Sequence, residues 1–126
     1  MTSPITTHVL DTTLGRPAEG VAIVLEKRDS QEAQGAQEGE REERGWTVVG
    51  RGVTDGDGRL RSLMGEGTLT VGTYRITFDA GGYHARIGVK GFYPEASIVF
   101  LVEDAQGHYH VPLLLNPFGY ATYRGS

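Results

Sequence analysis

Alternating hydrophobic and polar positions run through most of the chain, and this period-two pattern predicts short β-strands. In residues 73–78, for example, Tyr74, Ile76 and Phe78 fall on one face and the residues between them on the other. Glycine-rich stretches separate the alternating runs, which favours antiparallel strands over helices. One short helix is expected at about 80–86. The expected strands are at about 4–11, 20–28, 45–53, 59–63, 68–71, 73–79, 97–103, 107–115 and 119–124.

Residues 55–58 read Asp-Gly-Asp-Gly, which is typical of a tight turn because Asp-Gly pairs readily adopt positive φ. Nine short strands with turn signals between them indicate an all-β fold, and a β-sandwich in particular. With 126 residues the chain is long enough for one hydrophobic core but too short for two. We therefore expect a single domain that spans residues 1–126.

Residues 29–44 interrupt this pattern, because they contain no large apolar side chain. They carry six acidic and two basic residues, whereas the other 110 residues carry ten of each. The net charge of −4 is therefore local, and no basic face remains that would favour nucleic acid. Such a segment buries too little surface to offset its ordering entropy. We expect an acidic, flexible loop at about 29–44, and we favour this over a partner-binding element.

Composition narrows the class of protein further. The chain has no cysteine, which excludes disulfides, thiolate metal sites and cysteine nucleophiles. It has no apolar run long enough to span a bilayer, and residues 1–7 lack the basic and apolar regions of a secretory signal. We therefore expect a cytoplasmic protein that does not contact membranes.

Two histidines lie in the strand expected at 107–115. Because His108 and His110 are two residues apart, both project from one face of the strand. Tyr109 and Val111 then line the opposite face, which we assign to the core. Pro112 has no amide hydrogen to donate, so it predicts an edge strand or a bulge. A polar face that carries two histidines needs a chemical explanation.

A metal site is one explanation for this pair, since a His-x-His sequence can bind zinc or copper. A catalytic zinc site also needs a third protein ligand, and His8 and His84 are the only other histidines. We therefore expect no metal. Taken by itself, a His-x-His sequence is more often a surface pair or a hydrogen-bonded structural pair. His8 shares a strand face with Thr6 and Leu10, so it can be a half-buried histidine satisfied by a threonine or a carbonyl group.

The residues at the end of the chain are candidates for anion recognition. Tyr123, Arg124 and Ser126 bring an aromatic hydroxyl, a guanidinium and a serine with a free carboxylate within four positions. Arginine offers a rigid fork of donors to planar oxyanions. Arg59, directly after the Asp-Gly turn, is by itself an ordinary solvated residue at a strand start. No Gly-x-Ser-x-Gly sequence supports a serine-hydrolase triad, and no phosphate-binding glycine loop is present.

Three separated motifs resemble those of a known family. They are Thr-His-Val-Leu-Asp at 7–11, Thr-Asp-Gly-Asp-Gly-Arg at 54–59, and His-Tyr-His-Val-Pro-Leu-Leu-Leu at 108–115 followed by Tyr-Arg-Gly-Ser at 123–126. Together they resemble the 5-hydroxyisourate hydrolases, the transthyretin-related enzymes of purine breakdown. The resemblance covers nearly the whole chain except 29–44. The family usually carries Asn where this chain has Asp55, and a turn tolerates either residue.

The resemblance implies a transthyretin-like β-sandwich of two four-stranded sheets with one short helix. It also implies a homotetramer, with sites in a channel at the dimer–dimer interface. The implied reaction is hydrolysis of 5-hydroxyisourate to 2-oxo-4-hydroxy-4-carboxy-5-ureidoimidazoline, with no cofactor.

The same resemblance implies roles for particular residues. Catalysis is assigned to His110 as the principal base, to His8 as its partner, to Arg59 and to Ser126. A neutral histidine can deprotonate water near neutral pH, and an arginine can stabilise the developing negative charge. His8 and Arg59 would also bind the substrate, and the residues that would close the site are Tyr123, Arg124 and Ser126.

Two other interpretations remain. A non-enzymatic transthyretin-like module would bind a small aromatic ligand in the same channel. Such a channel would be lined by aliphatic side chains instead of histidine and arginine. A purely structural immunoglobulin-like domain would leave the three motifs unexplained. The polar set in this sequence favours the enzyme.

Overall fold

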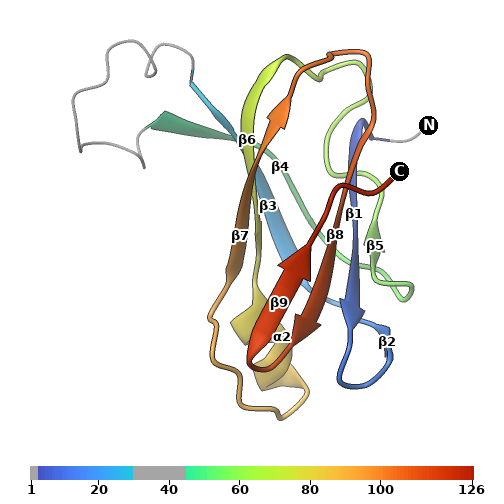
Figure 1. Cartoon of the computed structure of the whole chain (residues 1–126), viewed down its shortest axis with the longest axis vertical. Helices are drawn as coiled ribbons and strands as arrows, with labels where there is room; N and C mark the ends of the chain where they lie inside the picture. Colours follow the sequence, from blue (N-terminus) through green and yellow to red (C-terminus); the bar gives the residue numbers. More distant parts are fainter. Residues whose placement is uncertain (1–2, 30–44) are drawn as a thin grey trace.

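Two β-sheets pack face to face in this computed structural model, which describes residues 3–29 and 45–126 (Figure 1). The first sheet contains β1 (Ile5–Asp11), β2 (Arg16–Pro17), β5 (Arg59–Leu60), β8 (Tyr109–Asn116) and β9 (Gly119–Thr122). The second contains β3 (Ala22–Arg28), β4 (Trp46–Val53), β6 (Gly72–Phe78) and β7 (Ala96–Val102). A short helix, α2 (Ala80–Arg86), lies at one end of the sandwich.

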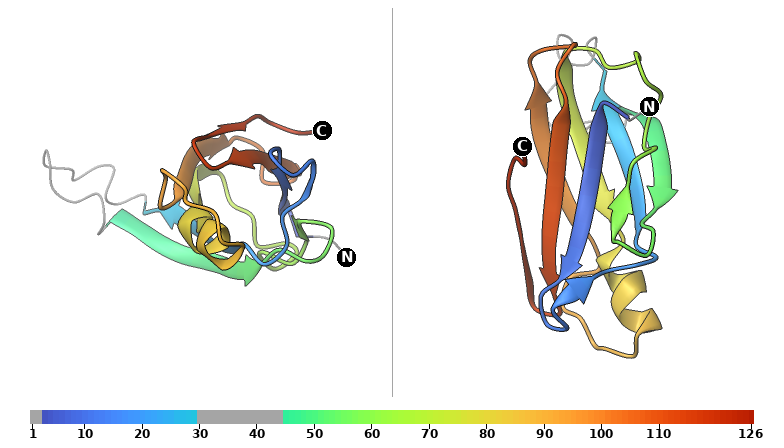
Figure 2. Two further views of the ribbon diagram at one scale, coloured as in Figure 1. Left: turned by 90° about the horizontal axis from the view of Figure 1, so that it is seen from below. Right: turned by 90° about the vertical axis from the view of Figure 1, so that its right-hand side faces the viewer.

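The first sheet places the beginning and the end of the chain side by side. Its order is β2-β1-β8-β9, and β1 runs parallel to β8, from Ile5 opposite Tyr109 to Asp11 opposite Leu115. The short strands β2 and β5 pair antiparallel with different parts of β1. Seen from the side, β1 and β8 lie next to each other across this face (Figure 2).

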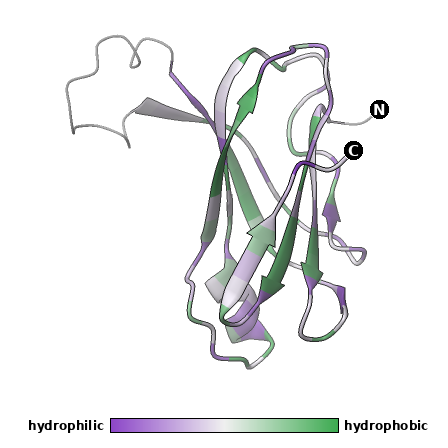
Figure 3. Ribbon diagram, viewed as in Figure 1, coloured by the Kyte–Doolittle hydropathy of each residue, from purple (hydrophilic) through white to green (hydrophobic). Residues whose placement is uncertain are grey.

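The second sheet is antiparallel throughout, in the order β4-β3-β6-β7. Alternate residues of its strands point toward the first sheet, and Tyr74, Ile76 and Phe78 are buried as the alternation predicts. Val9 and Leu113 are buried on the facing side. Apolar residues run along the strands, while the turns are mostly hydrophilic (Figure 3).

The helix α2 covers one end of the core. Its first turn is capped by Asp79, whose Oδ1 accepts a hydrogen bond from the backbone N–H of Gly82 at 3.0 Å. The Tyr83 hydroxyl donates to Asp11 Oδ2 at 2.7 Å, which joins the helix to the end of β1. Burial raises the pKa of Tyr83 to about 12, and the bond to Asp11 adds to the shift. The phenol therefore remains a donor at all ordinary pH values.

The all-β sandwich and the helix at 80–86 are confirmed. Eight of the nine predicted strands match observed strands, although that predicted at 59–63 is formed only at Arg59–Leu60. The strand predicted at 68–71 is wrong. There the Tyr74 hydroxyl accepts from the N–H of Thr70 and donates to its carbonyl, so these backbone groups are paired outside any sheet.

The first sheet has five strands instead of the four expected, because the two-residue strands β2 and β5 both pair with β1. Such short strands leave no period-two pattern in the sequence. The predicted loop at 29–44 lies outside the described residues except for Asp29, whose N–H donates to the Gly45 carbonyl at 2.7 Å. The two ends of that segment therefore meet. Within the described part of the chain, no helix combines the length and the apolar character that crossing a membrane requires.

Candidate active site

The outward face of the first sheet brings polar side chains from three neighbouring strands together. The β1–β8 register places Thr6 opposite His110, and the β1–β5 register places His8 opposite Arg59. Because side chains alternate between the faces of a strand, His108 projects on the same side as His110. The sequence motifs at 7–11, 54–59 and 108–115 therefore meet on one surface.

The Asp-Gly-Asp-Gly turn fixes the position of Arg59. Asp55 Oδ1 accepts hydrogen bonds from the backbone N–H groups of Asp57 at 2.8 Å and Arg59 at 3.0 Å. These bonds hold the pKa of the Asp55 carboxyl below its usual value. Gly58 has a φ of +74°, and a Cβ at this position would collide with the carbonyl oxygen of Val9. Glycine is therefore required for the turn to approach β1 so closely.

The same turn fixes the tautomer of His8. The Nε2 atom of this half-buried ring lies 2.9 Å from the backbone carbonyl oxygen of Asp57. Because a carbonyl can only accept a hydrogen bond, Nε2 carries a proton, and the neutral ring has its lone pair at Nδ1. A carbonyl thus satisfies His8, as one of the sequence-based alternatives proposed.

His110 is held by Thr6. Thr6 Oγ1 lies 2.9 Å from His110 Nδ1 and 3.2 Å from His108 Nε2, so one hydroxyl bridges the two histidines. Burial lowers the pKa of His110 below its ordinary value, and the charge of Arg59 lowers it further, with smaller contributions from His8 and His108. His110 is therefore neutral at pH 7, which is the form that can accept a proton.

Pro112 interrupts the pairing of β8 with β9. The ladder covers residues 113–116 of β8, and one further bridge joins His110 to Gly125. The prediction of an edge strand or a bulge at Pro112 is wrong, because β8 lies between β1 and β9 and its register with the last residues is unbroken. The missing N–H of Pro112 instead removes a ladder bond opposite residues 123–124.

The residues after this gap pack on the ring of His110. The N–H of Gly125 donates to the carbonyl of His110 at 2.8 Å. A Cβ at Gly125 would lie only 2.6 Å from His110 Cδ2 and 3.3 Å from Pro112 Cγ. Ser126 follows as an exposed residue next to this contact, and the Tyr123 side chain is 59% exposed. Glycine at position 125 therefore allows the chain to approach His110 this closely, because any side chain would collide with the ring.

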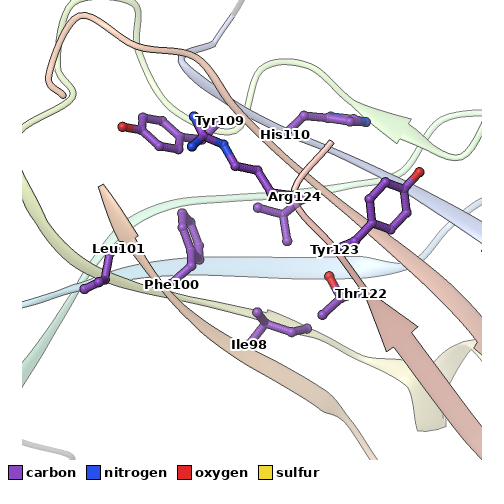
Figure 4. A pocket seen from close by; sticks show the side chains of 9 residues that line it. Ile98, Phe100, Leu101, Tyr109, His110, Thr122, Tyr123 and Arg124 are labelled. Carbon is purple, nitrogen blue, oxygen red and sulfur yellow. The ribbon is translucent and has the colours of Figure 1, made fainter. Parts of the chain in front are cut away.

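Arg124 points away from the other candidates. Its guanidinium carbon lies 4.6 Å from the centroid of the Tyr109 ring, a cation–π contact on the inner side of the sheet. In Figure 4 the Arg124 side chain runs toward Tyr109, while Tyr123 points in the opposite direction. Arg124 lines a cavity of about 330 Å³ at the open side of the sandwich. Apolar residues that also line it are Ile98, Phe100, Leu101 and Val111.

The structure thus brings His8, Arg59 and His110 together, and it places Gly125, the residue before Ser126, against His110. Sequence reasoning missed Thr6, the carbonyl of Asp57 and Gly125 as parts of this site. The position of Thr6 two residues before His8 on the same strand face was a usable signal. No cluster of three or more histidine, aspartate or glutamate side chains that could bind a metal occurs within residues 3–29 and 45–126.

A sequence model of the HIUase/Transthyretin family matches residues 5–125. The chain belongs to this family. It is 43% identical to a 5-hydroxyisourate hydrolase of Rhizobium meliloti, over 97% of this chain and 95% of that protein. The solved 5-hydroxyisourate hydrolase of Klebsiella pneumoniae is 33% identical with a TM-score of 0.73, and the match covers 97% of this chain and 92% of that one.

The family contains proteins of different function on one fold. Sea bream transthyretin, solved in complex with thyroxine, is 31% identical to this chain with a TM-score of 0.81, and the match covers 98% of this chain and 95% of that one. Overall shape therefore does not separate a hydrolase from a relative that binds thyroxine. The side chains on the outward face of the first sheet must do so.

Proposed function

We propose that this protein hydrolyses 5-hydroxyisourate to 2-oxo-4-hydroxy-4-carboxy-5-ureidoimidazoline. The observation that carries the proposal is the grouping of a neutral histidine, a second histidine with a fixed tautomer and an arginine on one sheet face. This grouping supplies what hydrolysis of a cyclic amide needs: a base for water and a cation for the oxyanion. The family relatives named 5-hydroxyisourate hydrolase supply the substrate class.

In the proposed mechanism, His110 Nε2 accepts a proton from a water molecule as the water oxygen bonds to the amide carbonyl carbon. The carbonyl oxygen becomes an oxyanion, and the guanidinium of Arg59 stabilises it. The carbon–nitrogen bond then breaks, and the leaving nitrogen takes the proton from His110. His8 offers its Nδ1 lone pair to orient the substrate or the water, while Tyr123 and Ser126 border the site. Arg124 would act on substrate only by leaving its contact with Tyr109.

The test is the decay of 5-hydroxyisourate generated from urate by urate oxidase, followed by absorbance with and without the protein. Catalysed decay well above the spontaneous rate supports the proposal. An unchanged decay with folded protein would refute it and favour the ligand-binding alternative, which a parallel thyroxine titration measures directly. The polar face of β1, β5 and β8 argues against tight binding of a hydrophobic hormone.

The exposed apolar side chains support a further proposal, that the protein is a homotetramer. Val99 and Leu101 on the edge strand β7 are 54% and 62% exposed, and Phe118 is 72% exposed. Exposed apolar residues on an edge strand are typical of an association surface. Sedimentation equilibrium tests this, and a monomer at micromolar concentration would contradict it.

We propose the cytoplasm as the compartment, since a chain without cysteine gains nothing from an oxidising compartment.

A further inference from the structure

The hydroxyl of Thr6 joins two histidines that differ in their access to solvent. His110 is half-buried in the site, whereas His108 is exposed. Thr6 itself is only 6% exposed, because it lies beneath both rings. Its Oγ1 is within hydrogen-bonding distance of His110 Nδ1 and of His108 Nε2. His110, Thr6 and His108 therefore form a continuous hydrogen-bonded path from the site to the solvent-exposed surface.

A hydroxyl has one proton, so its bonds to two neutral rings have a direction. In one direction His110 Nδ1–H donates to Thr6, and Thr6 donates to His108 Nε2. This leaves the lone pair of His110 on Nε2, where it can accept a proton from water. In the other direction His110 carries its proton on Nε2 and cannot act as a base there. Only the first direction is compatible with a catalytic His110.

We propose that Thr6 and His108 form a proton relay that removes positive charge from His110 during the reaction. When Nε2 of His110 takes a proton from water, the Nδ1 proton passes to Thr6 Oγ1, and the Thr6 proton passes to His108 Nε2. Three bonds to hydrogen break and three form. His110 remains neutral, and the positive charge resides on His108. The relay runs in reverse when the leaving nitrogen is protonated.

The charges around His110 favour this transfer. Burial disfavours a proton on His110, and so do Arg59 from β5, His8 from β1 and His108 just before β8. Tyr123, which lies after β9, is a further titratable side chain that lines the same pocket as His110. A proton on exposed His108 is solvated by water and lies farther along the strand from Arg59. Thr6 and His108 are thus positioning residues that act through His110.

The inference rests on the proposed hydrolysis, and the experiment separates the two. Thr6→Val removes the hydroxyl with little change in volume, Thr6→Ser retains it, and Thr77→Val is the matched control on the other sheet. We expect Thr6→Val and His108→Ala each to lower kcat by about 10- to 100-fold, less than the roughly 100- to 10,000-fold that a general base itself contributes, with KM nearly unchanged. Thr6→Ser should restore most of the rate, and the double variant should be no slower than either single one.

Imidazole provides a readout that a structural role would not change. Because His108 is exposed, added imidazole should rescue His108→Ala, by taking the proton from Thr6, but should not rescue Thr6→Val. Full activity of Thr6→Val, or a slow Thr6→Val beside a fully active His108→Ala, would overturn the relay and leave the hydrolase intact. An inactive wild-type protein would instead refute the proposed function.

Nitrogen-15 NMR of the histidine rings tests the relay even without turnover. The relay requires both His108 and His110 to carry their proton on Nδ1 in the neutral resting protein. Finding His110 with its proton on Nε2 would overturn the relay whatever the activity. In Thr6→Val the Nδ1 proton of His110 should lose its hydrogen-bonded signal, while in Thr77→Val it should not.

Discussion

Replacing Gly125 by alanine is the sharpest perturbation that the site offers, because it adds one methyl group directly against the base. The new Cβ would lie 2.6 Å from His110 Cδ2 and 3.2 Å from its Cγ. Ordinary contact begins near 3.4 Å, so the ring or the chain must move by about 0.8 Å. The ring cannot rotate freely, since its Nδ1 is held by Thr6.

A displacement of this size has a predictable cost. A misplacement of about 1 Å in a catalytic group lowers the rate by roughly 100-fold, which corresponds to about 2.7 kcal/mol in the activation free energy. We therefore expect kcat/KM of Gly125→Ala to fall by about 30- to 100-fold. The melting temperature should fall by less than about 5 °C, because the contact lies near the surface and about 1 kcal/mol is at stake.

The matched control is Gly119→Ala, at the start of β9, the strand that leads to Gly125. A Cβ at Gly119 would meet nothing closer than 3.8 Å, so this variant should keep its activity and stability. The assay is the decay of 5-hydroxyisourate, combined with the ring NMR signals of His110. Wild-type kcat/KM in Gly125→Ala together with an unshifted His110 ring would refute the packing argument.

Four other predictions follow from the same geometry. Arg59→Ala should lower kcat/KM by about 100- to 1,000-fold, as expected for loss of an oxyanion donor, whereas the exposed Arg51→Ala should stay near wild type; the reverse result would contradict the assigned register. A tag added after Ser126 should abolish most activity with little loss of stability, while an amino-terminal tag should not, and equal activity of both fusions would place the chain end outside the site. Replacing residues 30–44 by a four-residue Gly/Ser turn should leave activity and melting temperature nearly unchanged, because the ends of this segment already meet; a large loss of either would mean that it contacts the core or another subunit. In an NMR titration His110 should gain its second ring proton below pH 6.5, and Arg59→Gln should raise the midpoint of this titration. Because the pKa of His110 is lower in the folded than in the unfolded protein, its contribution to the free energy of unfolding falls as the pH drops below about 6.5. A midpoint above pH 6.5 would contradict a neutral base.

The sandwich could be predicted from the sequence because its main strands alternate cleanly. The run from Tyr74 to Phe78 shows this, since every second residue is buried. Strands of two residues, such as β2 and β5, have no period to detect. The segment at 68–71 has the composition of a strand, but hydrogen bonds from the Tyr74 hydroxyl hold it in a loop. The strand propensity of this segment is therefore outweighed by the hydrogen bonds between Tyr74 and Thr70.

The family resemblance selects three residues that share one sheet face, His8, Arg59 and His110, but it could not predict how they are connected. The parallel register that sets Thr6 against His110 depends on residues more than 100 positions apart, and no local pattern encodes it. The tautomer of His8 depends on a backbone carbonyl, which carries no sequence signal. Arg124 has the right chemistry for an anion, yet alternation along the chain turns it to the inner face.

The parallel pairing of β1 with β8 has a consequence for how the protein is made. The site exists only after the first strand of the chain has found nearly the last, across a separation of 104 residues between Thr6 and His110. Contacts of such long range form slowly, because the entropy of closing the loop is lost before the contacts can stabilise it. A ribosome must therefore synthesise the chain past His110 before this residue can join His8 and Arg59, which the pairing of β1 with β5 can bring together earlier. Acquisition of activity during refolding then reports on completion of the first sheet, and not on formation of the second.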